Sequence, residues 1–255
     1  MIVEFELLGL VMAAFFAGMV DAVAGGGGLI QVPALLSVMP QAEAATLFGT
    51  NKLSSVFGTA SATWRYLRRV TVPIKVVFAA SITAFVLSFV GAALVSWFPA
   101  AVIRPVVFGL LVVVVIYTLW QPSLGITASN PLVERNVIPW AILCGSILGF
   151  YDGFFGPGTG SFLIFCFVRV FGFDFLRASA SAKVVNLSTN LAALAFFVPS
   201  GHVLWIIGIS MAVANIAGAQ VGAQVALKGG SKWVRWCFIA MSCCLILKVG
   251  ASLFV

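Results

Sequence analysis

The segment Asp21-Ala22-Val23-Ala24-Gly25-Gly26-Gly27-Gly28 places four consecutive glycines, preceded by one carboxylate, inside an otherwise apolar part of the chain. Four glycines in a row cannot hold a helix, because each loses more backbone entropy on folding than any other residue. Inside a membrane, such a break frees N–H and C=O groups that hydrocarbon cannot satisfy. It must therefore be buried in protein or line a polar cavity, which makes this segment a candidate site.

A second glycine-rich break, GFYDGFFGPGTG, occupies residues 149–160. Aligning Asp152 with Asp21 gives an offset of 131 residues (152 − 21), and the same offset pairs Gly18 with Gly149, Gly25 with Gly156, Gly27 with Gly158, Lys52 with Lys183, Gly91 with Gly222 and Arg104 with Arg235. We predict two copies of one unit, about 1–120 and 137–255, joined by a linker at 121–136. Broken helices at matching positions of two halves are typical of a transporter's binding site.

The composition places this chain in a lipid bilayer. Hydrophobic residues make up 62% of its 255 residues, charged residues make up 8%, and the mean hydropathy is +1.16. Globular proteins are about a quarter charged. We therefore expect a single membrane domain over 1–255, with a first span that is retained rather than cleaved as a signal peptide. The five cysteines, odd in number and in apolar stretches, are interpreted as packing residues.

Apolar runs of about 20 residues predict an all-α, polytopic fold of two inverted repeats, each with four transmembrane helices and one broken, re-entrant half-helix. In the first unit the expected spans are 5–24, 44–66, 76–98 and 102–120, with a half-helix at 29–39. In the second unit they are 137–151, 177–199, 203–227 and 233–254, with a half-helix at 161–170.

Basic residues in the short loops predict the orientation of the units, because cytoplasmic loops carry an excess of Lys and Arg. The loop around Arg68 and Arg69 is basic, whereas its repeat equivalent 200–202 has no Lys or Arg. The segment 228–235 is basic, and its counterpart 99–103 is uncharged. Equivalent loops should therefore lie on opposite sides of the membrane, with both termini extracytoplasmic. The net charge of +7 is explained by these loops, and no nucleic-acid partner is expected.

Two repeat-matched polar stripes predict a site for an anion. Lys52, Ser55 and Thr59 share one helix face, and their partners Lys183, Asn186 and Asn190 have the same spacing. A lysine within a span costs about 2.5–3.5 kcal/mol on insertion scales, so it needs a compensating partner. Ammonium and amide groups donate hydrogen bonds, as do the backbone N–H groups at half-helix N-termini. The expected substrate site is Asn51, Lys52, Ser55, Thr59, Lys183, Asn186, Asn190, Gly26, Gly27, Gly28, Gly158, Thr159 and Gly160.

Several alternatives remain open from sequence. Asp21 and Asp152 could pair with the lysines, carry a coupling proton or cap a half-helix. The lysines could instead extend along the span to reach the membrane interface, and the two glycine clusters could serve close helix packing. For Gly91, Gly145, Gly218 and Gly222, helix packing is the favoured interpretation.

The segments 24–33, 49–52, 149–162 and 182–190 resemble the sulfite exporter TauE/SafE family, and the resemblance covers nearly the whole chain. Members of this family are small carriers of bacterial and archaeal inner membranes, associated with movement of sulfite, sulfoacetate, sulfonates and related organic anions. The resemblance implies the same membrane and substrate class here, without naming the anion.

The broken helices and polar stripes favour a secondary transporter of an anion that works by alternating access around a pseudo-symmetric midplane site. The resemblance implies, more specifically, an exporter of a small organosulfur or sulfur oxyanion. The alternatives are a passive anion channel, a carboxylate transporter and, less favoured, an intramembrane hydrolase with Ser161 as nucleophile and His202 as base. No catalytic residue, metal or cofactor is expected. The expected partners are the anion and membrane lipid, and a homodimer is left open.

Overall fold

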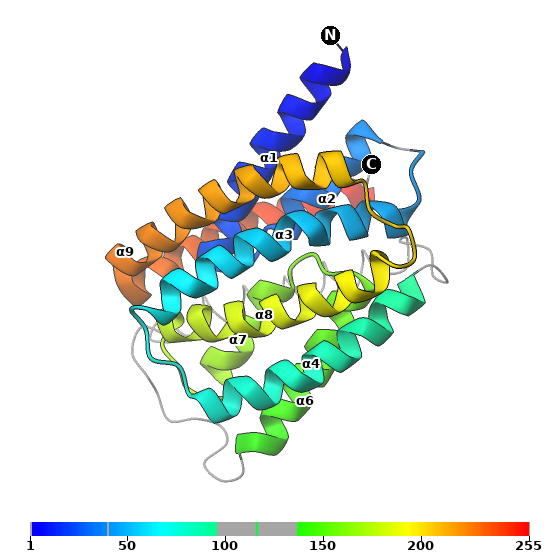
Figure 1. Cartoon of the computed structure of the whole chain (residues 1–255). Coiled ribbons are helices and arrows are strands. Elements are labelled where there is room, and N and C mark those ends of the chain that lie inside the picture. The colour runs from blue at the N-terminus through cyan, green and yellow to red at the C-terminus, as the bar shows by residue number, and fades with distance from the viewer. Residues whose placement is uncertain (1, 40, 96–115, 117–136, 255) are drawn as a thin grey trace.

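The structure is a computed structural model that describes residues 2–39, 41–95, 116 and 137–254, and within these ranges every regular element is a helix (Figure 1). The predicted span 102–120 and the linker 121–136 lie outside the described residues, apart from Ile116. The elements are α1 (Ile2–Ala24), α2 (Gly28–Val38), α3 (Ala44–Leu67), α4 (Ile74–Leu94), α6 (Val137–Phe154), α7 (Thr159–Arg169), α8 (Phe175–Phe197) and α9 (Trp205–Phe254).

The helices of the two units begin at matching positions. The helices α2, α3 and α4 begin at Gly28, Ala44 and Ile74, and the helices α7, α8 and α9 begin 131 residues later, at Thr159, Phe175 and Trp205. The helix α8 begins two residues before its predicted start because Asp174 caps it, accepting hydrogen bonds from the backbone N–H groups of Leu176 and Arg177 at 3.0 Å each. The predicted spans 203–227 and 233–254 form the two parts of α9, which bends where Gly230 adopts a φ of 67°.

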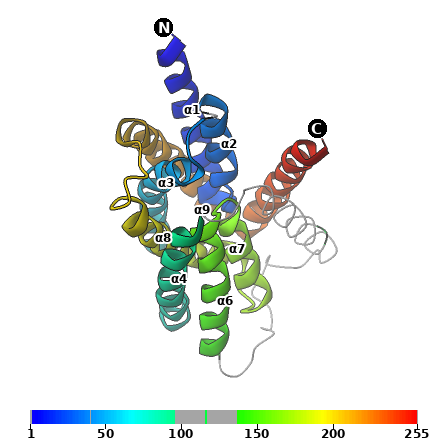
Figure 2. The ribbon, with the colours of Figure 1, turned by 90° about the vertical axis from the view of Figure 1, so that its right-hand side faces the viewer.

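The two units interlock instead of lying side by side. The helix α1 of the first unit packs along α9 of the second, and α6 of the second packs along α4 of the first. Likewise α3 packs on α9, and α8 packs on α4. At the centre α3 packs on α8, and Figure 1 shows α9, α3, α8 and α4 in one row, with α3 and α8 running in opposite directions. Figure 2 shows the half-helices α2 and α7 near the middle of the bundle.

Glycines allow the interlocked helices to approach closely. A Cβ atom on Gly18 would lie 2.3 Å from the carbonyl oxygen of Asn215 in α9, and a Cβ on Gly222 would lie 2.2 Å from that of Met19 in α1. The matching contact between α4 and α6 is as tight, since a Cβ on Gly91 would lie 2.3 Å from the carbonyl oxygen of Phe150. Small residues let membrane helices pack backbone to backbone, so the packing interpretation of Gly91 and Gly222 is confirmed.

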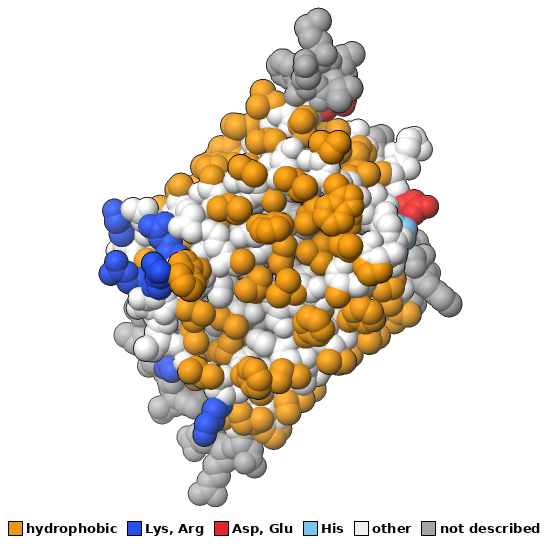
Figure 3. All heavy atoms as spheres, in the orientation of Figure 1, with side chains coloured by type: hydrophobic (Ala, Val, Ile, Leu, Met, Phe, Trp, Pro, Cys, Tyr) orange, Lys and Arg blue, Asp and Glu red, His pale blue; other side chains and the backbone are white. Residues whose placement is uncertain are grey.

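Four of the described helical segments are long and apolar enough to cross a membrane: 6–24 in α1, Ile74–Leu94, Val137–Phe154 and 205–240 in α9. The helices α3 and α8, with 24 and 23 residues, are long enough but more polar, because they carry the buried lysines and their neighbours. Figure 3 shows hydrophobic side chains over most of the visible face, as expected for a surface in contact with lipid. The chain is a membrane protein whose two most polar helices occupy its centre.

The glycine contacts predict a position-dependent response to alanine. Replacing Gly18 by alanine forces α1 away from α9 and should destabilise the protein by about 1–3 kcal/mol, the usual effect of overpacking. Gly9 lies on the same helix, and a Cβ there would meet nothing within 4 Å, so Gly9→Ala should leave the stability unchanged or slightly raised. Thermal unfolding in detergent, followed by fluorescence and size-exclusion chromatography, compares the two. Equal midpoints for both variants would contradict the contact.

Candidate functional site

Both glycine segments interrupt their helices. Between α1 and α2 the chain breaks at Gly25, which has a φ of 78°. Between α6 and α7 it breaks at Gly156 and Gly158, with φ values of 87° and 89°. A positive φ is strained for residues with a side chain. The repeat-matched pair Gly25 and Gly156 therefore explains why both spans end where they do.

The two breaks lie against each other. A Cβ on Gly25 would lie 2.2 Å from the carbonyl carbon of Gly160, and a Cβ on Gly160 would lie 2.5 Å from the Cα of Gly25. Gly28 faces Pro157, with 3.3 Å between its Cβ position and the Cα of Pro157. The glycines thus serve two purposes, since they bend the chain and they let the two backbones touch.

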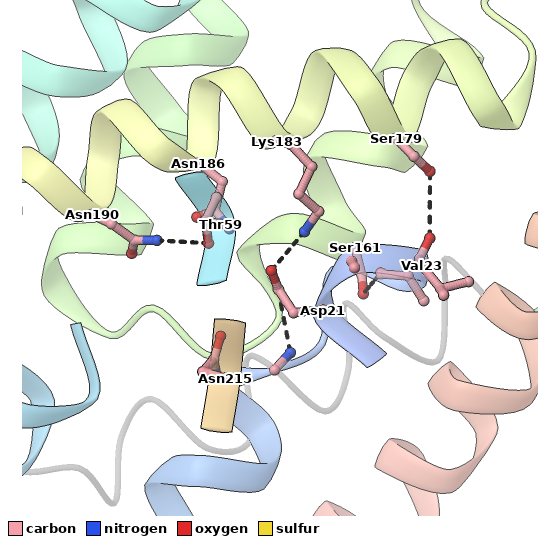
Figure 4. A network of polar contacts seen from close by, with 12 residues as sticks. Asp21, Val23, Thr59, Ser161, Ser179, Lys183, Asn186, Asn190 and Asn215 are labelled. Carbon is pink, nitrogen blue, oxygen red and sulfur yellow. Dashed lines mark hydrogen bonds and ion pairs between the residues drawn. The ribbon is translucent and has the colours of Figure 1, made fainter. Parts of the chain in front are cut away.

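Hydroxyl groups from other helices satisfy the backbone carbonyls that the first break frees. At the end of α1, Tyr66 donates to Ala22 at 2.9 Å, Ser179 donates to Val23 at 3.4 Å, and Ser161 donates to Ala24 at 2.7 Å. Figure 4 shows Ser161 and Ser179 directed at this helix end. At the second break, Thr159 donates to the carbonyl oxygen of Gly156 and Tyr151 donates to that of Pro157, both at 2.7 Å. Side chains thus satisfy five carbonyl groups at the two breaks, which the hydrocarbon of a membrane could not do.

Two ion pairs cross between the units. Lys52 of the first unit contacts Asp152 of the second, with 2.5 Å between Nζ and Oδ2. Lys183 of the second unit contacts Asp21 of the first at 2.8 Å (Figure 4). Each lysine lies on α3 or α8, and each aspartate lies four residues before the positive-φ glycine in the break of its own unit. Of the alternatives left open for the aspartates, the structure displays pairing with lysine for both. Asp21 also caps the half-helix α2, since its Oδ1 atom accepts a hydrogen bond from the backbone N–H of Gly27 at 3.5 Å.

Both lysines are buried in protein. The side chain of Lys52 is 4% exposed and that of Lys183 is fully buried, so neither extends to the membrane interface. An isolated buried ammonium group is very costly, whereas one in contact with a carboxylate is tolerated. The ion pairs therefore supply the compensation that these lysines require.

Amide groups extend the Lys52 pair. The Oδ1 atom of Asn190 accepts a hydrogen bond from Lys52 Nζ at 3.0 Å, and its Nδ2 atom donates to Thr59 at 3.4 Å. Asn51 is 4% exposed, and its Oδ1 atom has no hydrogen-bond partner. A buried amide oxygen without a partner is unusual. Because an amide can turn over to present either its oxygen or its nitrogen, Asn51 can donate to a ligand as well as accept.

A small cavity lies where these groups meet. Its volume is about 20 Å³, which is close to the space that one water molecule needs. The residues that line it come from both units and both breaks: Asp21, Gly25, Gly28, Asn51, Lys52, Ser55, Thr59, Asp152, Gly156, Gly158, Gly160, Asn186 and Asn190.

Most of the predicted substrate-site residues line this cavity, with four exceptions. Lys183 lies behind it and contacts it through Asp21. Gly26, Gly27 and Thr159 do not line it, and Thr159 instead supports Gly156. Gly25 and Gly156, which begin the two glycine segments expected to supply backbone donors, also line the cavity. Tyr66 and Ser179 were missed altogether, because nothing in the sequence shows which carbonyl a hydroxyl group will reach.

The hydrolase alternative does not fit the site. The Ser161 hydroxyl donates to the carbonyl oxygen of Ala24. His202 lies elsewhere, where its Nδ1 atom is 3.2 Å from the Thr46 hydroxyl and 3.6 Å from a Glu43 oxygen. A nucleophile needs its base within hydrogen-bond reach, and these two residues are engaged with other partners.

The chain is similar to known membrane transporters over nearly its whole length. The family model described as sulfite exporter TauE/SafE matches residues 10–249. A probable membrane transporter protein of Sinorhizobium sp, ORF9, is 36% identical over 250 residues, covering 97% of this chain and 94% of that protein. The probable membrane transporter protein YfcA of Escherichia coli K12 is 36% identical over 245 residues, covering 95% and 89%. No solved structure matches the chain.

The crossed ion pairs predict which double substitution restores stability. Lys52→Ala leaves Asp152 buried without its cation and should cost about 3–5 kcal/mol. Removing Asp152 as well should recover much of this loss, whereas combining Lys52→Ala with Asp21→Ala should recover none. Reversible unfolding in SDS measures the four free energies needed for each cycle. Recovery with Asp21 instead of Asp152 would show that the pairs form within a unit.

Proposed function

Because the chain belongs to the sulfite exporter TauE/SafE family, we propose that it exports a small organosulfur or sulfur oxyanion, such as sulfite, sulfoacetate or another sulfonate. The single observation that carries this proposal is the pair of crossed Lys–Asp contacts around the cavity where both helices break. Transport by alternating access requires a site shared by two halves that can move against each other. Here both halves contribute a lysine, an aspartate and a break.

The charges of the site allow a substrate anion to take the place of one of the two carboxylates. Lys52 and Lys183 balance Asp21 and Asp152, so the four groups have no net charge. An oxyanion accepts hydrogen bonds from ammonium groups just as a carboxylate does. We infer that the substrate displaces a carboxylate from its lysine, while Asn51 and Asn190 donate the remaining hydrogen bonds. The lysines are then never left without an anion during the cycle.

A displaced Asp21 has another donor nearby. Its Oδ1 atom lies 3.5 Å from the backbone nitrogen of Gly27, at the N-terminal end of α2, where free N–H groups favour an anion. The carboxylate can therefore stay ionised when the substrate takes its place. In that case the loaded carrier has the charge of its substrate and the unloaded carrier has none.

The membrane potential then drives export. An inside-negative potential moves an anion outward with about 2.3 kcal/mol per charge per 100 mV. The competing possibility is that the displaced aspartate takes up a proton. The loaded carrier would then move a monovalent anion without net charge and would respond to a pH gradient instead. Both possibilities use the same residues. They differ in the driving force, which is the membrane potential in the first and the proton gradient in the second.

The cavity of about 20 Å³ is too small for a sulfonate, so the site must widen to load. Gly25, Gly156 and Gly158 are the natural hinges, because their backbone tolerates dihedral changes that other residues resist. Widening at one break and then at the other would open the site to the two sides of the membrane in turn. From the family and from the basic loops of the sequence, we further propose that the protein lies in the cytoplasmic membrane of a bacterium or archaeon, with inverted units and extracytoplasmic termini.

Substrate class is tested by counterflow in proteoliposomes with sulfite, thiosulfate, sulfoacetate, taurine and carboxylates. At least one sulfur oxyanion should exchange with saturation, and Lys52→Ala and Lys183→Ala should reduce exchange by tenfold or more, since each removes a charged hydrogen bond to the substrate. Lys75→Ala, an exposed lysine at the start of α4, is the matched control and should exchange normally. If no anion in the panel moves, or if flux does not saturate, the carrier proposal fails.

The driving force is tested with the same vesicles under a potassium diffusion potential. An inside-negative potential should accelerate efflux of the anion, and a pH gradient of equal energy should have little effect. Asp21→Asn and Asp152→Asn should keep this response, because an amide can still move aside. Efflux that follows the pH gradient in the wild type, and loses this dependence in the Asn variants, would establish proton coupling instead.

A further inference from the structure

A second polar site lies at one end of the helix bundle, away from the small cavity between the two breaks, which we call the transport cavity. Arg65 and Arg68 at the end of α3, Arg69 just beyond it and Lys228 of α9 line a pocket of about 830 Å³. Figure 3 shows lysine and arginine side chains gathered at one end of the molecule. None of the residues that line the transport cavity lines this pocket.

Two of the four cations are held in place by neutral groups. Arg65 donates to the carbonyl oxygen of Gln220 at 3.1 Å, to its Oε1 atom at 2.6 Å and to Oε1 of Gln224 at 3.0 Å. The guanidinium of Arg68 stacks over the ring of Trp64 at 4.3 Å. Within the described residues, none of the four cations has a carboxylate partner. Four positive charges are thus concentrated in one pocket without an internal anion.

The acidic residue nearest in sequence to the residues of this pocket already has hydrogen-bond partners other than the four cations. Asp174 precedes Leu176 of the pocket wall, and its Oδ1 atom accepts bonds from the backbone nitrogens of Leu176 and Arg177 and from the Ser231 hydroxyl at 2.6 Å. Its charge is therefore directed at the N-terminus of α8. The pocket retains its positive charge.

An apolar groove starts at the same end of α3 as the basic pocket and follows α4. Its first part, of about 450 Å³, is lined by Leu67, Ile74 and Phe78 and by Val184 of α8. Its second part, of about 290 Å³, shares Phe78 and continues to Phe85. The groove and the basic pocket share no lining residue, but Leu67 of the groove precedes Arg68 of the pocket in the chain, so both open at the same end of α3. Ile74 and Phe78 are 76% and 64% exposed on the apolar surface.

We propose that the pocket and the groove together bind one anionic glycerophospholipid, with its phosphate among Arg68, Arg69 and Lys228 and one acyl chain along α4. Arginine binds phosphate oxygens through charge-assisted, often paired, hydrogen bonds. Basic pockets between membrane helices are typical sites for anionic headgroups, and the predicted cytoplasmic position of this end matches the anionic leaflet. A soluble phosphate would use the basic pocket but would gain nothing from the groove, which is why the lipid is favoured.

The test measures lipid binding to the purified full chain by native mass spectrometry and thermal unfolding. Phosphatidylglycerol should bind and raise the unfolding midpoint, and phosphatidylcholine should not. In Arg69→Ala/Lys228→Ala, phosphatidylglycerol should bind about 30-fold more weakly, since each basic residue near an anionic lipid contributes about a fivefold factor. Lys75→Ala/Lys232→Ala removes the same charge from exposed positions outside the pocket, and binding should change by less than about twofold.

Three results would overturn the proposal. Equal loss in both double variants would show that lipid binding is only general surface attraction. Glycerol 3-phosphate raising the midpoint as much as phosphatidylglycerol at equal concentration would assign the pocket to a soluble anion. Equal affinity for dihexanoyl and dioleoyl phosphatidylglycerol would show that the groove holds no acyl chain. If the pocket double variant does not purify in folded form, Arg69→Gln is compared with Lys75→Gln in the same way.

Discussion

The structure depends on two buried contacts between ammonium and carboxylate groups, each of which joins one unit to the other. Buried charges in a membrane are tolerated only when they are paired. Lys52 needs Asp152, and Lys183 needs Asp21, so neither unit can bury its own lysine without the other. The crossed ion pairs lie where α3 contacts α8 and where the two glycine breaks approach each other. The cavity lies at the same place.

The helix breaks are compatible with a membrane because side chains from other helices complete their hydrogen bonds. Tyr66, Ser161 and Ser179 satisfy three consecutive carbonyl groups at the end of α1. These contacts come from α3, α7 and α8, so the first break is supported by both units. A membrane transporter gains in this way a polar centre that is closed to lipid while its outer surface stays apolar.

Much of this architecture could be predicted from the sequence, because it depends on local properties. Repeated glycines predict a break in a helix. A single offset of 131 residues relates the starts of α2, α3 and α4 to those of α7, α8 and α9. The crossing of the ion pairs could not be predicted, since a helix face shows which residues share a side but not which residues lie opposite. For the same reason the sequence alone leaves Ser161 open as a nucleophile, whereas in the structure its hydroxyl donates to the carbonyl oxygen of Ala24.

The central claim is that the substrate anion takes the place of an aspartate on a lysine. Solid-state NMR of the protein in lipid, with ¹⁵N in lysine side chains and ¹³C in aspartate carboxyl groups, measures this contact directly. The account predicts close lysine–aspartate contacts in the unloaded protein, and the loss of at least one on adding a transported anion labelled with ¹³C, which then approaches a lysine nitrogen. Contacts that persist unchanged at saturating anion, with the anion remote from both lysines, would contradict it.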